Sequence, residues 1–173
     1  MAISLYDGSV NSYLQTLDAV NGFLDRGLSH CRNNNINPEE IVETRLFPDM
    51  RPFRFQIQSV VHHSVNAIEA IKSGLIGLPG ERPLHDYAGL QGLINDARSA
   101  LRKLTPEEIN AREGADVIFK VGDSERLFTA EGFLMSFSLP NFHFHATTAY
   151  DILRMKGAPL GKRDYMGALR LKA

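Results

Sequence analysis

The chain has 173 residues, of which 43% are hydrophobic and 23% charged, and its formal net charge is -1. This composition argues against extended disorder, and the length is typical of one compact domain with a full core. We therefore predict a single domain over residues 1–173. Because the net charge gives no long-range attraction to polyanions, we expect no nucleic-acid partner.

Three features of the sequence bear on its location. The single cysteine, Cys31, cannot form an internal disulfide, which fits a reducing compartment. The N-terminal segment lacks the basic region and apolar run that mark a signal peptide. No stretch approaches the ~20 apolar residues of a membrane-spanning helix. We predict a soluble, cytoplasmic protein with no membrane partner.

Hydrophobic residues recur at three- and four-residue steps in four stretches, which is the pattern of amphipathic helices. The predicted helices span residues 4–32, 50–73, 86–104 and 131–156. Pro140 is expected to kink or split the last of them. Two short strands within 115–121 and 126–130 predict a β-hairpin, whereas the segment from Gly74 is predicted to be a turn-rich loop. The predicted fold is mainly all-α, a four-helix bundle with a small β-hairpin before the last helix.

The last helix combines apolar residues with polar groups that can bind a ligand. Asn141, His145 and Thr148 step by four and three residues, and Ile152 follows four residues later, so all four share one helical face. Because Ile152 is apolar, we expect Asn141 and His145 to point into the bundle. His143 lies about 200° around the helix from His145, so regular helix geometry does not make this pair a chelate.

The second helix carries polar groups that could meet His145 across the bundle. Gln56 and His63 are seven residues apart beside the core stripe, whereas His62 is expected on the far, solvated side. Bundle-core ligand and metal sites are built from facing helices, so Gln56 or His63 could approach His145. Three interpretations of His145 remain open: a hydrogen-bonded core histidine, a metal ligand, or a metal-free binding or acid–base group.

Common catalytic signatures are missing from the sequence. It has neither the Glu-x-x-His pair of ferritin-like di-iron proteins nor a His-Glu-x-x-His zinc motif. The glycine-rich nucleotide-binding motifs and the Gly-x-Ser-x-Gly elbow of hydrolases are missing as well. These absences remove the common hydrolase, nucleotide-binding and dinucleotide-binding classes.

Three segments carry a family resemblance: SLYDGSVNSYLQTL near the start, RLFPDMRPFRFQIQ in the middle and LPNFHFHATTAYDILRMKGAPLGKRDYMG at the end. Together with the bundle layout they cover nearly the whole chain. The chain resembles the DinB/YfiT-like four-helix-bundle superfamily, and within it an uncharacterised branch built on a domain of unknown function. The resemblance implies an up-down-down-up order of the helices and a tendency to pair.

Metal-binding members of that superfamily hold a divalent metal with one histidine from the second helix and two from a His-x-x-x-His on the last. The family pattern ends in Leu-Arg-x-x-Gly, which matches residues 153–157 here. The resemblance therefore places His145 at the last histidine, Asn141 at the one before it and Gln56 near the first. Amide oxygens are poor ligands for zinc or nickel, so we expect a hydrogen-bonded cluster and no metal cofactor.

Two functional hypotheses follow, and the sequence leaves open whether the protein is an enzyme. The preferred one is a metal-free helical bundle that binds a small molecule or acts in regulation, with a polar cluster of Gln56, Asn141, His145 and Tyr150 around a pocket. The alternative is a divalent-metal-dependent transferase or hydrolase with a degenerate ligand set drawn from His145, Asn141, Gln56 and His63.

Four aromatic residues bear on assembly. Phe53 and Phe55 cannot both face inward because they are two residues apart on a helix, and Phe142 and Phe144 lie off the face that carries His145. These rings either pack under the hairpin or the tail, or form an exposed partner surface. With the resemblance, they lead us to predict a homodimer.

Overall fold

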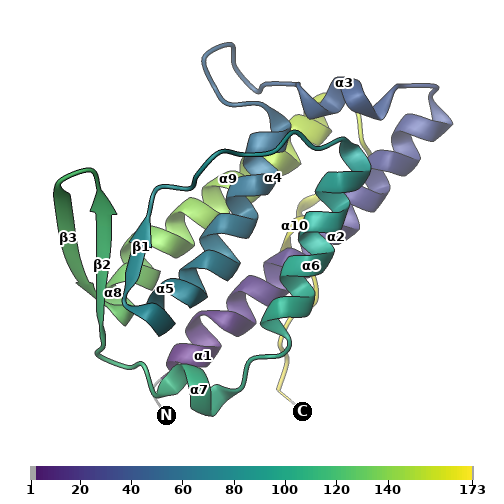
Figure 1. Ribbon diagram of the computed structural model, residues 1–173. Coiled ribbons are helices and arrows are strands. Elements are labelled where there is room, and N and C mark those ends of the chain that lie inside the picture. The colour runs from purple at the N-terminus through teal and green to yellow at the C-terminus, as the bar shows by residue number, and fades with distance from the viewer. Residues whose placement is uncertain (1–2, 173) are drawn as a thin grey trace.

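The computed structural model describes residues 3–172. Within that range four long helical segments form a bundle: α2 (Val10–Asn33), α4 continued by α5 (Phe53–Val61 and Ala67–Ser73), α6 (Tyr87–Leu101), and α8 continued by α9 (Ala130–Phe133 and Leu139–Met155). Figure 1 shows α2 and α9 running in one direction and α4, α5 and α6 in the other, which is the up-down-down-up order. No helix within these residues is long and apolar enough to cross a membrane.

Short helices connect and extend the bundle: α1 (Leu5–Gly8), α3 (Pro38–Val42), α7 (Pro106–Asn110) and α10 (Lys162–Met166). The side chains of Asn37 and Thr105 accept hydrogen bonds from the first turns of α3 and α7 and so fix where these helices begin. The first predicted helix is broken at Ser9, where ψ is -78° and the hydroxyl donates to the Leu5 carbonyl. A local side-chain hydrogen bond here competes with the continuous helix that the periodicity predicted.

A three-stranded sheet lies beside the bundle within the described range (Figure 1). β1 (Leu75–Gly77) pairs in parallel with β2 (Asp116–Val121), which pairs antiparallel with β3 (Ser124–Thr129). The predicted hairpin is therefore confirmed, but the loop predicted after Gly74 contains a strand. Gly74 has φ of +78°, a left-handed conformation that favours glycine, and it turns the chain from α5 into β1.

Residues 78–86, here called the strap, lead from β1 across the helices to α6 (Figure 1). The strap is fastened to α4 by two side-chain hydrogen bonds. Gln58 Nε2 donates to the Pro83 carbonyl over 2.7 Å, and Arg82 Nη1 donates to Ser59 Oγ over 2.8 Å. At the end of the strap, Asp86 caps α6 by accepting from the Gly89 N–H. The strap is thus held over one flank of α4.

The core accounts for two of the four aromatic residues that bear on assembly. Phe142 is fully buried with its ring edge-on to Tyr13, and Phe53 is fully buried and stacks on Tyr87. Phe144 is 56% exposed. Only part of the expected aromatic surface is therefore available to a partner, and the homodimer stays a prediction.

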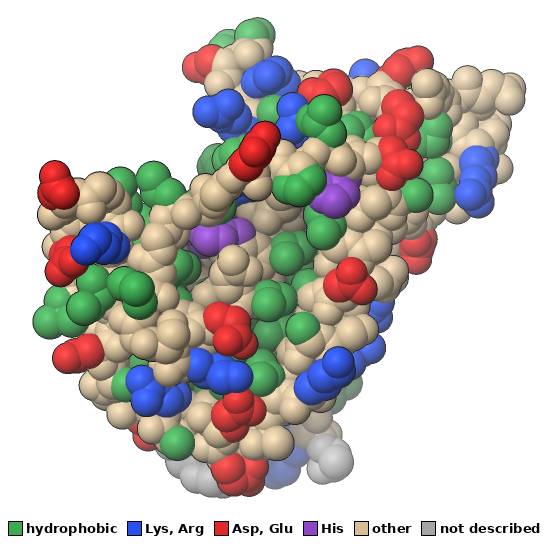
Figure 2. Space-filling view, viewed as in Figure 1, with side chains coloured by type: hydrophobic (Ala, Val, Ile, Leu, Met, Phe, Trp, Pro, Cys, Tyr) green, Lys and Arg blue, Asp and Glu red, His purple; other side chains and the backbone are tan. Residues whose placement is uncertain are grey.

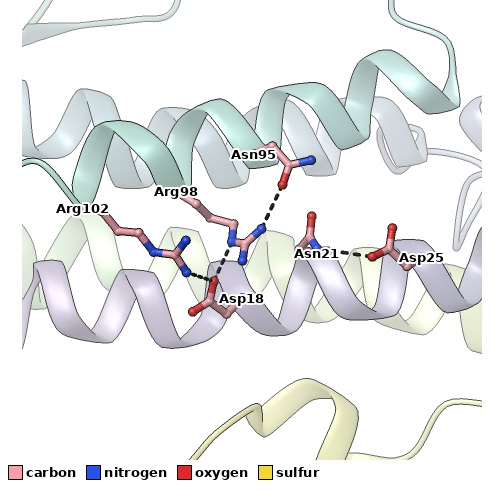
Figure 3. A network of polar contacts seen from close by, with 6 residues as sticks. All are labelled: Asp18, Asn21, Asp25, Asn95, Arg98 and Arg102. Atoms are coloured by element: carbon pink, nitrogen blue, oxygen red, sulfur yellow. Dashed lines mark hydrogen bonds and ion pairs between the residues drawn. The ribbon is translucent and has the colours of Figure 1, made fainter.

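A polar network joins α2 and α6 along their exposed sides (Figure 3). Asp18 of α2 accepts hydrogen bonds from Arg98 Nε and from Arg102 Nη2 of α6, the latter over 2.9 Å. Asn95 Oδ1 accepts from Arg98 Nη1 over 2.9 Å and so orients the guanidinium. Exposed ion pairs of this kind contribute about 0.2 to 1 kcal/mol each, so the network adds little to the stability of the fold.

Candidate functional site

A pocket of about 500 Å³ opens between α4, the start of α9, the strap and β2. Its walls combine three imidazoles, one guanidinium and three phenyl rings, from His62, His63, His145, Arg82, Phe55, Phe119 and Phe137. On the face shown in Figure 2, histidine side chains are visible in a hollow between the sheet and the helices. The predicted site residues His63, Asn141 and His145 line this pocket.

Two π-helical turns, η1 (His62–Asn66) and η2 (Leu134–Ser138), interrupt the helices that form the pocket. A π turn holds more residues than an α turn, so it changes which side chains share a face, and such turns recur at functional sites. In η1 both His62 and His63 reach the pocket, so the expectation that His62 lies on the far, solvated side was wrong. η2 ends two residues before Pro140, which is where an irregularity was predicted.

A buried hydrogen-bond chain ties the two π turns together. Ser138 Oγ donates to the His63 carbonyl over 2.7 Å, and the Tyr13 hydroxyl lies 2.7 Å from the same Ser138 oxygen. Because the Ser138 proton is used on the carbonyl, Tyr13 is the donor of the second bond. Burial raises the pKa of Tyr13, so its hydroxyl keeps its proton. The chain therefore fixes the backbone from which the His63 side chain projects.

The tautomer of His145 follows from its hydrogen bond to Gln56. The Gln56 amide nitrogen donates to the Arg51 carbonyl over 2.8 Å, which leaves its Oε1 as an acceptor facing His145. His145 Nδ1 lies 2.7 Å from that oxygen and must therefore carry the proton. In the neutral ring the other nitrogen, Nε2, is then an acceptor. Gln56 is buried behind the imidazole and holds it in place.

The pocket histidines are held in their neutral forms. The rings of His63 and His145 lie nearly parallel with centroids 5.7 Å apart. Burial, helped by His62, His145 and Arg82, lowers the pKa of His63 to about 3. Burial, helped by Arg82 and His62, lowers the pKa of His145 to about 4. At neutral pH these imidazoles are therefore uncharged donors and acceptors.

Arg82 supplies the positive charge of the pocket. Its guanidinium carbon lies 4.1 Å from the centre of the Phe55 ring, and Nη1 also donates to the Phe55 carbonyl over 3.3 Å. The Arg51 guanidinium carbon lies 5.5 Å from the centre of the same ring. Burial and the nearby Arg51 lower the pKa of Arg82, yet a guanidinium stays protonated at neutral pH. Phe55 thus holds Arg82 in position through a cation–π contact.

Most of the polar cluster predicted from the sequence forms, but one member lies elsewhere. Asn141 lines the pocket and donates through Nδ2 to the Phe137 carbonyl, which leaves its oxygen available. Tyr150 packs edge-on against Phe23 and Tyr165 and does not line the pocket, because a position five residues after His145 lies on another side of α9. The prediction for Tyr150 was wrong.

The residues present do not fit the metal site that the superfamily resemblance implies. Within residues 3–172 no group of three or more His, Cys, Asp or Glu side chains is placed to hold a metal ion. Gln56 Oε1 is engaged by His145, so it is a hydrogen-bond partner of that imidazole. No carboxylate lines the pocket within the described range, and hard or borderline divalent metals favour such ligands or additional imidazoles.

Sequence reasoning missed most of the pocket lining, including Phe55, Arg82 and His62. The periodicity of the second helix gave no sign of the π turn that brings in His62. Arg82 comes from a Gly- and Pro-containing segment that carries no helical or strand pattern, so its place across the bundle follows only from the fold. The only hint in the sequence was that Arg82 is the sole arginine in the loop that precedes the Asp86 cap.

A second hollow of about 690 Å³ lies near the N-terminal end of α2, between residues 3–12, η2 and Arg170. His143 lines this hollow, and burial lowers its pKa; its Nδ1 lies 3.4 Å from the Tyr165 hydroxyl. His143 and His145 thus face different cavities, which agrees with the prediction that they do not form a chelate. None of Gln56, His63, Asn141 and His145 lines the second hollow.

The up-down-down-up order of the four helices is that of a DinB-like helical bundle. A crystal structure of a DinB family member from Shewanella denitrificans has the same fold, with a TM-score of 0.80 and 24% sequence identity over 98% of this chain and 95% of that one. A comparison with curated proteins gives no significant match. The family described as a domain of unknown function, DUF1993, matches residues 5–166, and the chain belongs to it.

Proposed function

We propose that this DinB-like protein is a metal-free helical bundle whose pocket binds a small molecule. The observation that carries the proposal is the Gln56–His145 pair, which presents a neutral imidazole with a fixed tautomer to the cavity. The cavity, at about 500 Å³, lies within the roughly 300 to 1,000 Å³ of small-molecule sites. Its aromatic walls and few convergent polar groups are also typical of such sites.

The chemistry of the site supports binding more than metal-assisted catalysis. A neutral amide orients His145, and it raises the basicity of the imidazole less than a carboxylate partner would. A pKa near 4 also makes His145 a weak base at neutral pH, which reduces its value as a proton acceptor. Both features favour an imidazole that accepts a hydrogen bond from a bound molecule.

A fragment screen observed by NMR tests this function. The expected result is that some small aromatic or polar fragments shift the imidazole signals of both His63 and His145, because both rings line the cavity. His145→Gln should weaken these fragments, since it removes the oriented acceptor. His30→Gln is the matched control, because His30 hydrogen-bonds the Lys156 carbonyl away from the pocket. Fragments that shift only signals around the second hollow would contradict the proposal.

A further inference from the structure

One edge of the Arg82 guanidinium makes no hydrogen bond to the described part of the chain. Nη1 donates to Ser59 Oγ and to the Phe55 carbonyl, whereas Nε and Nη2 make no hydrogen bond within residues 3–172. No carboxylate in that range forms an ion pair with Arg82. The Nε–Nη2 edge of a guanidinium offers two parallel N–H groups, which match the two oxygens of a carboxylate.

The charge around this edge is positive and unbalanced. Arg51 shares the Phe55 ring with Arg82, so two guanidinium groups lie close together. The described residues that line the pocket include no Asp or Glu. His63 and His145 are neutral because partial or full burial and the nearby Arg82 lower their pKa values. A half-buried cation without a counter-ion favours binding of an anion, since charges in such places are normally paired.

The other residues of the pocket favour an anion that carries a flat apolar group. Phe119 and Phe137 have ring centroids 5.0 Å apart, and with Phe55 they give the cavity flat apolar walls. A planar apolar group can pack against these rings and remove their surface from water. Asn141 and His145 add hydrogen-bonding groups between the aromatic wall and the strap.

We propose that the pocket binds small organic carboxylates with a flat apolar body, and that Arg82 holds the carboxylate through its Nε–Nη2 edge. This inference rests on the proposed function and narrows its ligand to one chemical class. Arg82 is then the residue that determines specificity for an anion, and Phe55 fixes its guanidinium. The strap thus supplies the positive charge of Arg82, and the aromatic side chains contact the apolar part of the ligand.

A matched pair of probes tests this inference, because 2-naphthoate and 2-naphthamide have nearly the same shape but differ in charge. Calorimetric titration of the wild-type protein should show at least roughly tenfold tighter binding of the carboxylate, as expected for a charge-assisted hydrogen bond. His63 and His145 NMR signals should shift in the same titration. Arg82→Gln should abolish the preference, and Arg82→Lys should retain only part of it. Arg32→Gln, an exposed position at the end of α2, should leave the preference unchanged.

The possible outcomes separate the two proposals. If the amide binds as tightly as the carboxylate, or if Arg82→Gln keeps the preference, the anion inference fails while small-molecule binding stands. If neither probe binds or shifts the two histidines, the carboxylate inference is contradicted, and the fragment screen decides separately whether small-molecule binding stands. The comparison of the two probes on the wild-type protein needs no variant, so it remains decisive even if Arg82→Gln does not fold.

Discussion

Replacing Gly27 with alanine should destabilise the protein by about 2 to 4 kcal/mol, because the new methyl group has no space and displaces a buried hydrogen bond. A Cβ at Gly27 would lie 2.6 Å from the Tyr87 hydroxyl and 2.9 Å from Leu153 Cδ2. Tyr87 cannot move away at low cost, since its hydroxyl donates to the Leu24 carbonyl and its ring stacks on Phe53. The missing side chain at Gly27 thus lets α6 and α9 pack closely against α2.

The same helix provides a matched control for Gly27. An added Cβ at the exposed Gly22 would meet nothing within 4 Å, so Gly22→Ala should stabilise the protein by roughly 0.5 to 1 kcal/mol through helix propensity alone. Urea unfolding of both variants measures the contrast. Equal stability of the two would show that the three helices do not pack as described.

Acidification from pH 7.5 to 5 should lower the free energy of unfolding by roughly 1 to 3 kcal/mol through His63 and His145, a value discounted for their partial contact with solvent. In the unfolded chain both imidazoles have a pKa near 6.5 and gain protons over this range. In the folded protein, burial first and then neighbouring histidines and Arg82 lower the pKa values to about 3 and about 4. The unfolded state therefore binds more protons, and stability present above pH 6.5 is lost as the pH falls towards 4.

The pH effect can be assigned to these residues by substitution. His63→Gln and His145→Gln should each flatten the dependence of unfolding free energy on pH between 7.5 and 5, because glutamine does not titrate. Urea titrations at several pH values provide the measurement. A wild-type curve that is flat over this range, or variants that lose as much stability as the wild type, would mean that the pocket histidines are not held neutral.

Most of the fold was predictable because helical periodicity reports burial directly. The four long helices, the hairpin and the kink region at Pro140 all follow from patterns within one segment. The break at Ser9 depends on a single hydroxyl that binds a carbonyl, and β1 has three residues whose pairing partner lies some forty positions away in sequence. Such features depend on local chemistry or distant pairing, which periodicity does not report.

The site was predictable where residues lie on regular helix and not elsewhere. Asn141 and His145, four residues apart on α9, both line the pocket as expected, and Gln56 meets His145 across the bundle. His62 was misplaced because η1 alters the helical phase, and Tyr150 because the predicted cluster ignored its angle around α9. Arg82 reaches the site only because the strap crosses the bundle, and no sequence pattern specifies that path.

Elemental analysis of the purified protein tests the metal-free site most directly. We predict zinc, nickel and manganese contents far below one ion per chain, and no change on His145→Ala, because the site offers no suitable set of ligands within the described residues. Metal bound in a stoichiometric amount by the wild-type protein and lost in His145→Ala would contradict the account and favour a metalloenzyme.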